Sequence, residues 1–214
     1  TTLTQPSLNS GVVWRVTDAD TIRLTVARGV QLPTLLQYGL DWRINVVPPR
    51  VYVGSPRLDP AIVWNTELDY DRTLAPLNST LRLALFVQRT QDVIAWPFGA
   101  PPAGTVRGVP LFFSSNVGST DAAGGELEIK GHAASGFRWQ ASYALAATAD
   151  HTLLNQGPVP NSIVAYDDAT PRHVVIGGIG YAEGKWEADL LGRWQSRYLD
   201  FRVNRQRTAL LPIS

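Results

Sequence analysis

Two carboxylates and an ammonium group occur at alternate positions in Glu126, Glu128 and Lys130. In an extended strand, side chains two residues apart point to the same face, so the trio could act as a general acid and base. The spacing equally fits charges that line a wet interior and are held by cross-strand partners. We favour this second interpretation and expect no enzyme activity, since the sequence holds no Gly-x-Ser-x-Gly or other nucleophile motif.

Metal and cofactor sites are not expected either. His132, His151 and His173 are dispersed, without a second ligand at metal spacing, and the chain has no Cys. Residues 178–184 superficially resemble a dinucleotide-binding loop, but the third Gly comes one place late and no helical pattern follows. The sequence therefore predicts a chain with no cofactor and no metal of its own.

Aromatic and cationic side chains gather in two long segments that are rich in Pro and Gly. Such side chains suit an anionic or aromatic ligand, and loops on a rigid scaffold commonly carry recognition residues. Alternatively, the rings pack the loops against each other while the Arg side chains are solvated or bind lipopolysaccharide phosphates. The candidate substrate-binding residues are Trp42, Arg43, Arg50 and Tyr52 in the first segment, and Trp96, Phe98 and Arg107 in the second.

The elements that would position these residues are β-strands. Eight segments alternate apolar and polar residues, the period-two pattern typical of strands. Helical periodicity does not extend beyond a turn or two, except at residues 33–39. The predicted strands are 11–17, 21–29, 62–72, 80–90, 124–132, 137–148, 172–181 and 186–199.

The connections between these strands alternate in length. Short turns at 18–20, 73–79, 133–136 and 182–185 are made of turn-forming residues. Long segments at 30–61, 91–123 and 149–171 join the successive hairpins. All short turns would then lie at one rim of the sheet, which is the outer-membrane barrel pattern of short periplasmic turns and long extracellular loops.

Charges are sorted to one face of the predicted strands, with exceptions at the strand ends Arg28 and Arg72. In residues 186–198 every even position is uncharged, whereas the odd positions carry the charges. We expect the polar face to line a lumen and the apolar face to meet lipid. The predicted lumen-facing set is Glu126, Glu128, Lys130, Arg138, Glu187, Asp189, Arg193 and Arg197.

Aromatic residues lie where a membrane interface would be. Most are within a few residues of a short turn, as expected for an aromatic girdle. Trp186 and Tyr198 are about 12 residues apart, which at ~3.3 Å per residue and ~40° tilt spans about 30 Å, close to an apolar band of ~25 Å with its girdles. The predicted lipid-facing aromatics are Trp14, Tyr70, Phe137, Trp139, Tyr181, Trp186, Trp194 and Tyr198.

Composition excludes several other classes. The 214 residues have a net charge of +1 and are 44% hydrophobic, which argues against nucleic-acid binding and against disorder. No apolar run reaches the ~18 residues of a membrane-spanning helix. The absence of Met suggests an internal fragment. The predicted fold is all-β: an antiparallel up-and-down transmembrane β-barrel segment of about eight strands, with short periplasmic turns and long extracellular loops.

Several motifs carry a family resemblance. Residues 20–33 (DTIRLTVARGVQLP), 54–60 (GSPRLDP) with 64–70 (WNTELDY), 86–94 (FVQRTQDVI), and 116–118 leading into 125–128 follow one another in order. Their order and spacing resemble the distal barrel portion of TonB-dependent outer-membrane receptors. Ser55, Ala61 and Asp69 depart from the pattern, which usually has Asn, Glu and Gly at these places.

The resemblance implies a barrel of about 22 strands with a plug in its lumen. It implies residence in the bacterial outer membrane, contact with outer-membrane lipid, and TonB-energised uptake of a scarce small-molecule nutrient: siderophore-bound iron, cobalamin or a carbohydrate. The TonB complex would act through the plug, and no nucleic acid is expected as a partner. Residues 1–214 would then form one partial barrel domain without the plug and the remaining strands.

Two other classes of protein also fit the sequence. Eight strands are enough to close a small barrel with a structural or adhesive role, against which an unpaired edge strand would argue. A soluble β-sandwich that binds carbohydrate also alternates apolar and polar residues. It would need the face of Trp186 and Trp194 to be a core between two sheets.

Overall fold

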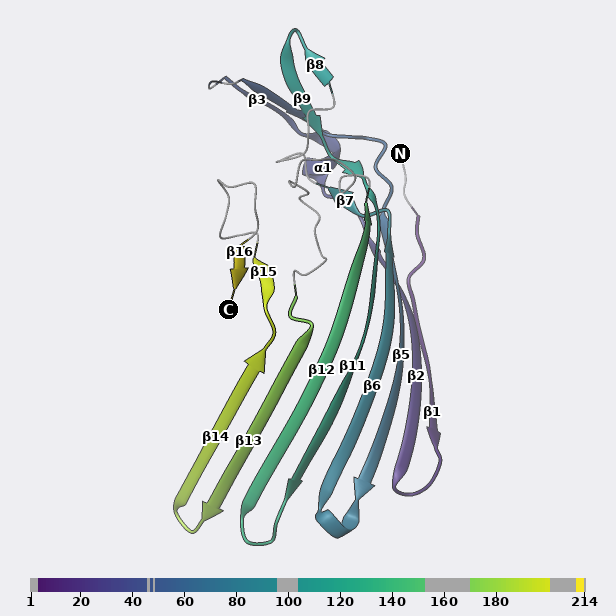
Figure 1. The fold of residues 1–214 in the computed structure, drawn as a ribbon. Helices are drawn as coiled ribbons and strands as arrows, with labels where there is room; N and C mark the ends of the chain where they lie inside the picture. Colours follow the sequence, from purple (N-terminus) through teal and green to yellow (C-terminus); the bar gives the residue numbers. More distant parts are fainter. Residues whose placement is uncertain are drawn as a thin grey trace.

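Eight long strands form a single antiparallel sheet in which neighbours along the chain are neighbours in space (Figure 1). A computed structural model describes residues 4–45, 47, 49–95, 104–152, 170–200 and 211–213. The sheet order is β1-β2-β5-β6-β11-β12-β13-β14, and the all-β prediction is confirmed. The strands are β1 (Leu8–Arg15), β2 (Asp20–Gln31), β5 (Ala61–Leu74), β6 (Ser79–Gln91), β11 (Gly118–His132), β12 (Phe137–Thr152), β13 (His173–Glu183) and β14 (Trp186–Gln195).

Short turns close the hairpins at one end of the sheet (Figure 1). In the first turn, the Thr17 hydroxyl accepts hydrogen bonds from the backbone N–H groups of Ala19 and Asp20, at 3.1 and 3.0 Å. The second turn contains the 3₁₀ helix η1 (Ala75–Leu77), which ends at Asn78 in the left-handed conformation. Each turn thus uses residues that stabilise a tight reversal locally.

The eighth strand is shorter than predicted. β14 ends at Gln195, and β15 (Tyr198–Asp200) pairs instead with β16 (Leu211–Ile213) in a separate two-stranded sheet. The partner strand β13 begins at His173, whose carbonyl accepts the Ser196 N–H, so the ladder has no partner residues beyond this point. The prediction that residues 186–199 form one strand was therefore wrong at its end, and Arg197 and Tyr198 lie outside the eight-stranded sheet.

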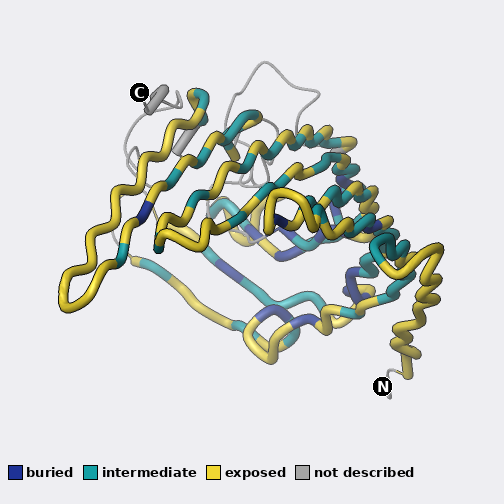
Figure 2. The backbone as a smooth tube through the Cα atoms, turned by 90° about the horizontal axis from the view of Figure 1, so that it is seen from below, coloured by how far each residue is buried: buried dark blue, intermediate teal, exposed yellow. Residues whose placement is uncertain are grey.

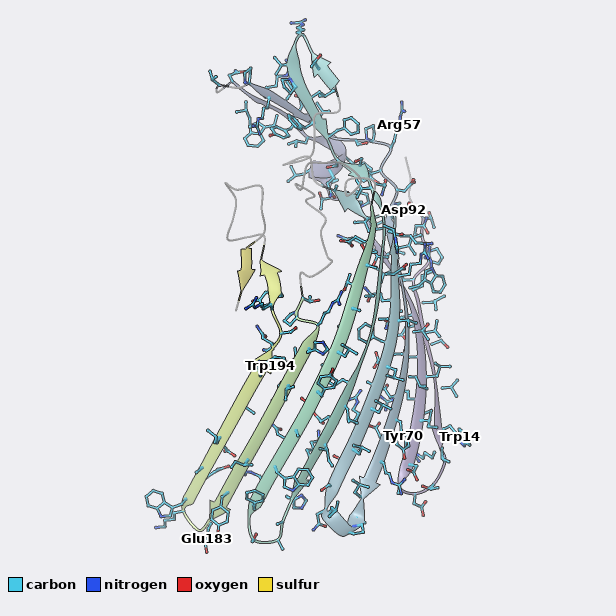
Figure 3. All side chains as sticks on the ribbon, viewed as in Figure 1. Trp14, Arg57, Tyr70, Asp92, Glu183 and Trp194 are labelled. Atoms are coloured by element: carbon cyan, nitrogen blue, oxygen red, sulfur yellow. The ribbon has the colours of Figure 1, made fainter. Side chains whose placement is uncertain are left out.

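The register joins the predicted apolar faces of all eight strands into one surface. Direct cross-strand neighbours run in a single row from β1 to β14: Trp14, Ile22, Tyr70, Leu83, Leu127, Tyr143, Val175 and Trp194. Trp14 and Tyr70 lie near the short turns, whereas Trp194 lies well above them (Figure 3). The row climbs across the sheet because the strands are staggered, as in a barrel wall.

Exposure differs between the strands of this curved sheet (Figure 2): β1 and β14 are exposed throughout, whereas exposure alternates along β12. In β12 the odd positions from Ala141 to Ala149 are exposed and the even positions are half-buried. The odd positions belong to the apolar face, so the apolar residues occupy the more open side of the sheet. We call the face that carries Trp14, Leu68 and Trp194 the outer face, and the opposite one the inner face.

Both edges of the sheet are open among the described residues. β1 pairs with β2 alone, and β14 pairs with β13 alone. A small closed barrel would join these two edges, and a sandwich would divide the strands between two packed sheets. The described sheet therefore has neither of the alternative folds. None of the helices in the described ranges reaches the length and apolarity needed to cross a membrane.

A smaller sheet stands at the end of the molecule opposite the short turns (Figure 1). It has the order β3-β4-β9-β8, and the β4–β9 pair is parallel. The sequence predicted only long loops here, except for helix α1 (Leu35–Gly39), which lies within the predicted helical stretch 33–39. The bounds are β3 (Asp41–Ile44), β4 (Arg50–Val53), β8 (Gly104–Val106) and β9 (Val109–Phe113), with a further pair β7 (Ile94–Ala95) and β10 (Ser115–Asn116).

Candidate functional site

Helix α1 anchors the first long segment above the sheet. Thr34 and Gln37 form a capping box, in which the Thr34 N–H donates to Gln37 Oε1 at 2.7 Å and the Gln37 N–H donates to Thr34 Oγ1 at 3.3 Å. The Gly54 N–H donates to the Leu40 carbonyl at 2.6 Å, and Tyr38 Oη donates to the Leu58 carbonyl at 3.3 Å. The helix therefore fixes the base of the β3–β4 hairpin.

Asn116 ties the first long segment to the second. Its side-chain oxygen accepts the Asp59 N–H at 2.9 Å, and its amide nitrogen donates to the Asp59 and Asp92 carbonyls at 2.9 and 2.7 Å. Beside it, Val93, Ala95 and Val117 form a small buried cluster. The sequence analysis quoted Asn116 in a family motif but gave it no role. A side-chain amide can satisfy donors and acceptors of separate strands at once, so this Asn connects the two segments rigidly.

Three aromatic rings stack across the small sheet. Tyr52 lies between Trp42 and Phe112, with ring-centroid distances of 5.8 and 5.1 Å. The Arg50 guanidinium lies 5.9 Å from the Phe112 centroid. Rings at such separations attract each other beyond their area burial, and a cation over a ring adds to this attraction. The stack thus holds β3, β4 and β9 together.

The predicted ligand-contact residues differ in accessibility. Tyr52 is only 3% exposed, so its ring is occupied by packing, as the alternative interpretation expects, whereas Trp42 is 48% exposed. Arg43 is exposed and pairs with Asp41 at 3.5 Å, and Arg107 lies in the β8–β9 turn with a φ of 51°. Trp96 and Phe98 lie outside the described residues. The structure brings Trp42, Arg50 and Tyr52 into one ring stack, places Arg43 on the opposite face of β3, and places Arg107 in the β8–β9 turn on the other side of the same sheet.

The inner face carries most of the strand charges. The register places seven members of the predicted lumen-facing set there, that is, all except Arg197. Lys130 Nζ is 3.0 Å from Glu128 Oε1, so two of the three groups considered for acid–base chemistry are paired with each other. Arg138 Nη2 pairs with Glu187 Oε1 at 2.6 Å and with Asp189 Oδ1 at 3.0 Å.

The most buried charge on this face is Asp69. Its side chain is 3% exposed, with Arg82 Nη2 at 3.1 Å and Arg23 Nη1 at 3.9 Å. This cross-strand arrangement of opposite charges is the typical means of stabilising polar groups on a sheet face. In the part of the chain that the structure describes, no three His, Cys, Asp or Glu residues are grouped as metal ligands.

The sheet is similar in fold to parts of several solved structures. The siderophore receptor PirA from Acinetobacter baumannii matches at a TM-score of 0.66 with 15% identity, over 90% of this chain and 29% of its own. The FrpB iron transporter from Neisseria meningitidis (F3-3 variant) matches at 0.62 with 13% identity, over 89% and 27%. The ferric enterobactin receptor from Pseudomonas aeruginosa matches at 0.66 with 15% identity, over 90% and 28%. At these identities the likeness shows the fold, and the chain spans under a third of each relative's length.

Comparison with curated sequences finds no match. The family described as TonB dependent receptor-like, beta-barrel, matches residues 2–209, which is nearly the whole chain. The eight-stranded sheet is accordingly part of a receptor barrel of the bacterial outer membrane, in a family of transporters and not of enzymes. The chain belongs to the TonB-dependent receptor β-barrel family.

Proposed function

We propose that the chain supplies part of the barrel wall and extracellular loops of a TonB-energised receptor that takes up a ferric siderophore. The observation that carries the substrate class is the ring stack of the loop sheet, which has the exposed Trp42 at one end and the Arg50 cation against Phe112 at the other. An aromatic surface next to a guanidinium suits an aromatic, anionic iron chelate. The structurally similar proteins named as siderophore or iron receptors support the same choice.

We further propose how the two faces serve uptake. The outer face, with its aromatic residues near the short turns, would meet lipid, while the charged inner face would line the lumen. Residues 1–214 would then be one partial barrel domain. The plug and the other strands would be supplied by other parts of the same protein, and the TonB complex would act through the plug.

Binding of a catecholate siderophore tests the substrate class. In the full-length receptor, Trp42→Ala and Arg50→Gln should each weaken ferric-catecholate affinity about tenfold, which is the loss of one cation–π or charge-assisted contact. Affinity would be measured by titration of the purified receptor, and uptake by cells given ⁵⁵Fe-labelled siderophore. Deletion of TonB should abolish uptake and leave binding intact.

Arg57→Gln is the matched control, because Arg57 is an exposed cation on the loop side of the molecule without a place in the ring stack (Figure 3). It should bind the chelate as the wild type does. Unchanged affinity in both Trp42→Ala and Arg50→Gln would contradict the proposed surface. Tighter binding of cobalamin or an oligosaccharide than of any ferric siderophore would contradict the substrate class.

A further inference from the structure

A row of charged and aromatic residues crosses the outer face near its loop end. Arg28, Trp64, Arg89 and Asp121 are successive cross-strand neighbours on β2, β5, β6 and β11. We call these four residues the charged row. The sequence analysis noted only Arg28 among them as an exception to the sorting of charges. Arg89 and Asp121 are further exceptions, and they lie in the same row.

A row of small and apolar residues lies directly beneath the charged row, toward the short turns. The small-residue row comprises Val26, Thr66, Val87, Ala123 and Ala147. All members of the two rows except Arg28 and Val26 line a groove with a volume of about 600 Å³, which Arg172 also lines. The groove is open because the side chains of β11 and β12 are small Ala residues here, and Trp64 forms part of its wall.

The charged row lies at the level of the membrane boundary. Arg89 is about ten residues beyond Ser79, where β6 begins, so at ~3.3 Å per residue and ~40° tilt it stands about 25 Å above the short-turn end. This rise is close to the ~25 Å apolar band of outer-membrane barrels when it is counted from the short-turn end; counted from Leu83, in the row of Tyr70, it is about 15 Å. In β2, β5, β6 and β11, as the structure describes them, all outer-face positions between the charged row and the row of Tyr70 are uncharged.

The polar groups at the groove favour an anion. The charged residues of its lining are two Arg, Arg89 and Arg172, and one Asp, Asp121. Arg89 Nε is 3.7 Å from Asp121 Oδ1, and His151 Nε2 is 3.3 Å from Asp121 Oδ2, so the carboxylate is shared. Arg89 remains 57% exposed. Arg28, at the end of the charged row, lies outside the groove: its guanidinium is 5.8 Å from the Trp64 ring and donates hydrogen bonds to the Pro6 carbonyl and to Gln5 Oε1.

We propose that this groove binds a phosphate-bearing lipid of the outer leaflet. The headgroup phosphate lies at the charged row, because guanidinium groups bind phosphate through paired, charge-assisted hydrogen bonds. An acyl chain follows the small-residue row and the exposed Leu68 and Leu85 below it. Basic pockets at a membrane boundary are recognised sites for anionic headgroups.

Lipid binding by the full-length receptor tests this site. The protein would be purified in detergent, stripped of lipid, and titrated with bisphosphorylated lipid A or its monophosphoryl form under native mass spectrometry. The wild type should bind the bisphosphorylated lipid more tightly. The Arg89→Gln variant should lose about tenfold in affinity for it. Ala147→Trp should fill the groove and lose a similar amount without any change in charge.

Two control variants test whether loss of any positive charge, or addition of any large ring to the outer face, weakens lipid binding. Arg57→Gln removes one positive charge on the loop side, and Ala141→Trp adds the same ring to the outer face of the same strand β12, nearer the short turn. Both should bind as the wild type does, with folding checked by circular dichroism. Equal binding of the two lipids by the wild type would overturn the proposal, as would unchanged binding by Arg89→Gln or by Ala147→Trp. A dimer that Ala147→Trp dissociates would assign the groove to a second copy instead.

Discussion

One residue on the inner face, Asp69, differs from the residue that the family pattern usually has there. Asp69 occupies a place where the pattern has Gly, and the structure supplies its partners in Arg23 on β2 and Arg82 on β6. A carboxylate that is 3% exposed needs such partners, because burial of an unpaired charge is costly. The departure at this position is therefore compensated by residues on the two neighbouring strands.

Removal of this carboxylate should destabilise the barrel. In the full-length receptor, Asp69→Asn should lower the free energy of unfolding by about 1–3 kcal/mol, since two guanidinium groups then lose their shared acceptor. Urea unfolding in detergent would measure the shift. Asp71→Asn is the control, since Asp71 is 43% exposed and 4.0 Å from Arg82, and it should change the midpoint little. A larger effect of Asp71→Asn than of Asp69→Asn would contradict the assignment.

At the scale of elements, hairpins with local turn signals were predictable, and the structures above the sheet were not. Gly184 and Lys185 form a two-residue turn between the paired residues Glu183 and Trp186, and Gly184 has a φ of 58°. A positive φ at the first turn position is typical of a type II′ hairpin, where Gly is strongly preferred. Residues 182–185 were accordingly recognisable as a turn from the sequence.

The turn requires a positive φ at Gly184, which can be tested by substitution. Replacement by Ala puts a Cβ on a left-handed residue, so Gly184→Ala should lower the free energy of unfolding of the full-length receptor by about 1–2 kcal/mol. Gly192→Ala on β14 is the control, since the nearest atom to its added Cβ would be the Gly177 carbonyl oxygen at 3.9 Å. It should stay within about 0.5 kcal/mol of the wild type. Equal unfolding midpoints for the two variants would show that the turn conformation contributes nothing.

At the scale of the whole molecule, the sheet presents one continuous apolar face. Trp186 and Trp194 are 85% and 59% exposed on that face, far more than interior residues would be. Contiguous exposed apolar surface of this kind requires a partner, and for an outer-membrane barrel the partner is lipid. In the barrel that we propose, further strands would likewise cover the open edges β1 and β14.

Tryptophan quenching by bilayer-embedded bromolipids would establish the depth of this face. In reconstituted full-length receptor with a single Trp retained, Trp194 should be quenched strongly by bromines deep in the acyl chains. Trp186, beside the short turn, should be quenched best by bromines near the headgroups. Absence of quenching at both positions would mean that the face is covered by protein and would contradict the lipid-facing assignment.

The sequence by itself determined the strands and the sorting of their faces. Period-two alternation is a local property, so residues 137–148 and 80–90 could be recognised without their partners. The same locality explains the errors: residues 186–199 continue to alternate after β13 can no longer pair with them. The alternation of apolar and polar residues therefore does not show where a strand ends because its partner strand ends.

Only the tertiary structure decided which residues meet across strands. The small sheet depends on β4 pairing with β9, about 60 residues further along the chain, and no local periodicity encodes such a parallel contact. Tyr52 is buried rather than available to a ligand for the same reason. The charged row arises from the cross-strand register, because Arg28, Trp64 and Arg89 become neighbours only when three strands align.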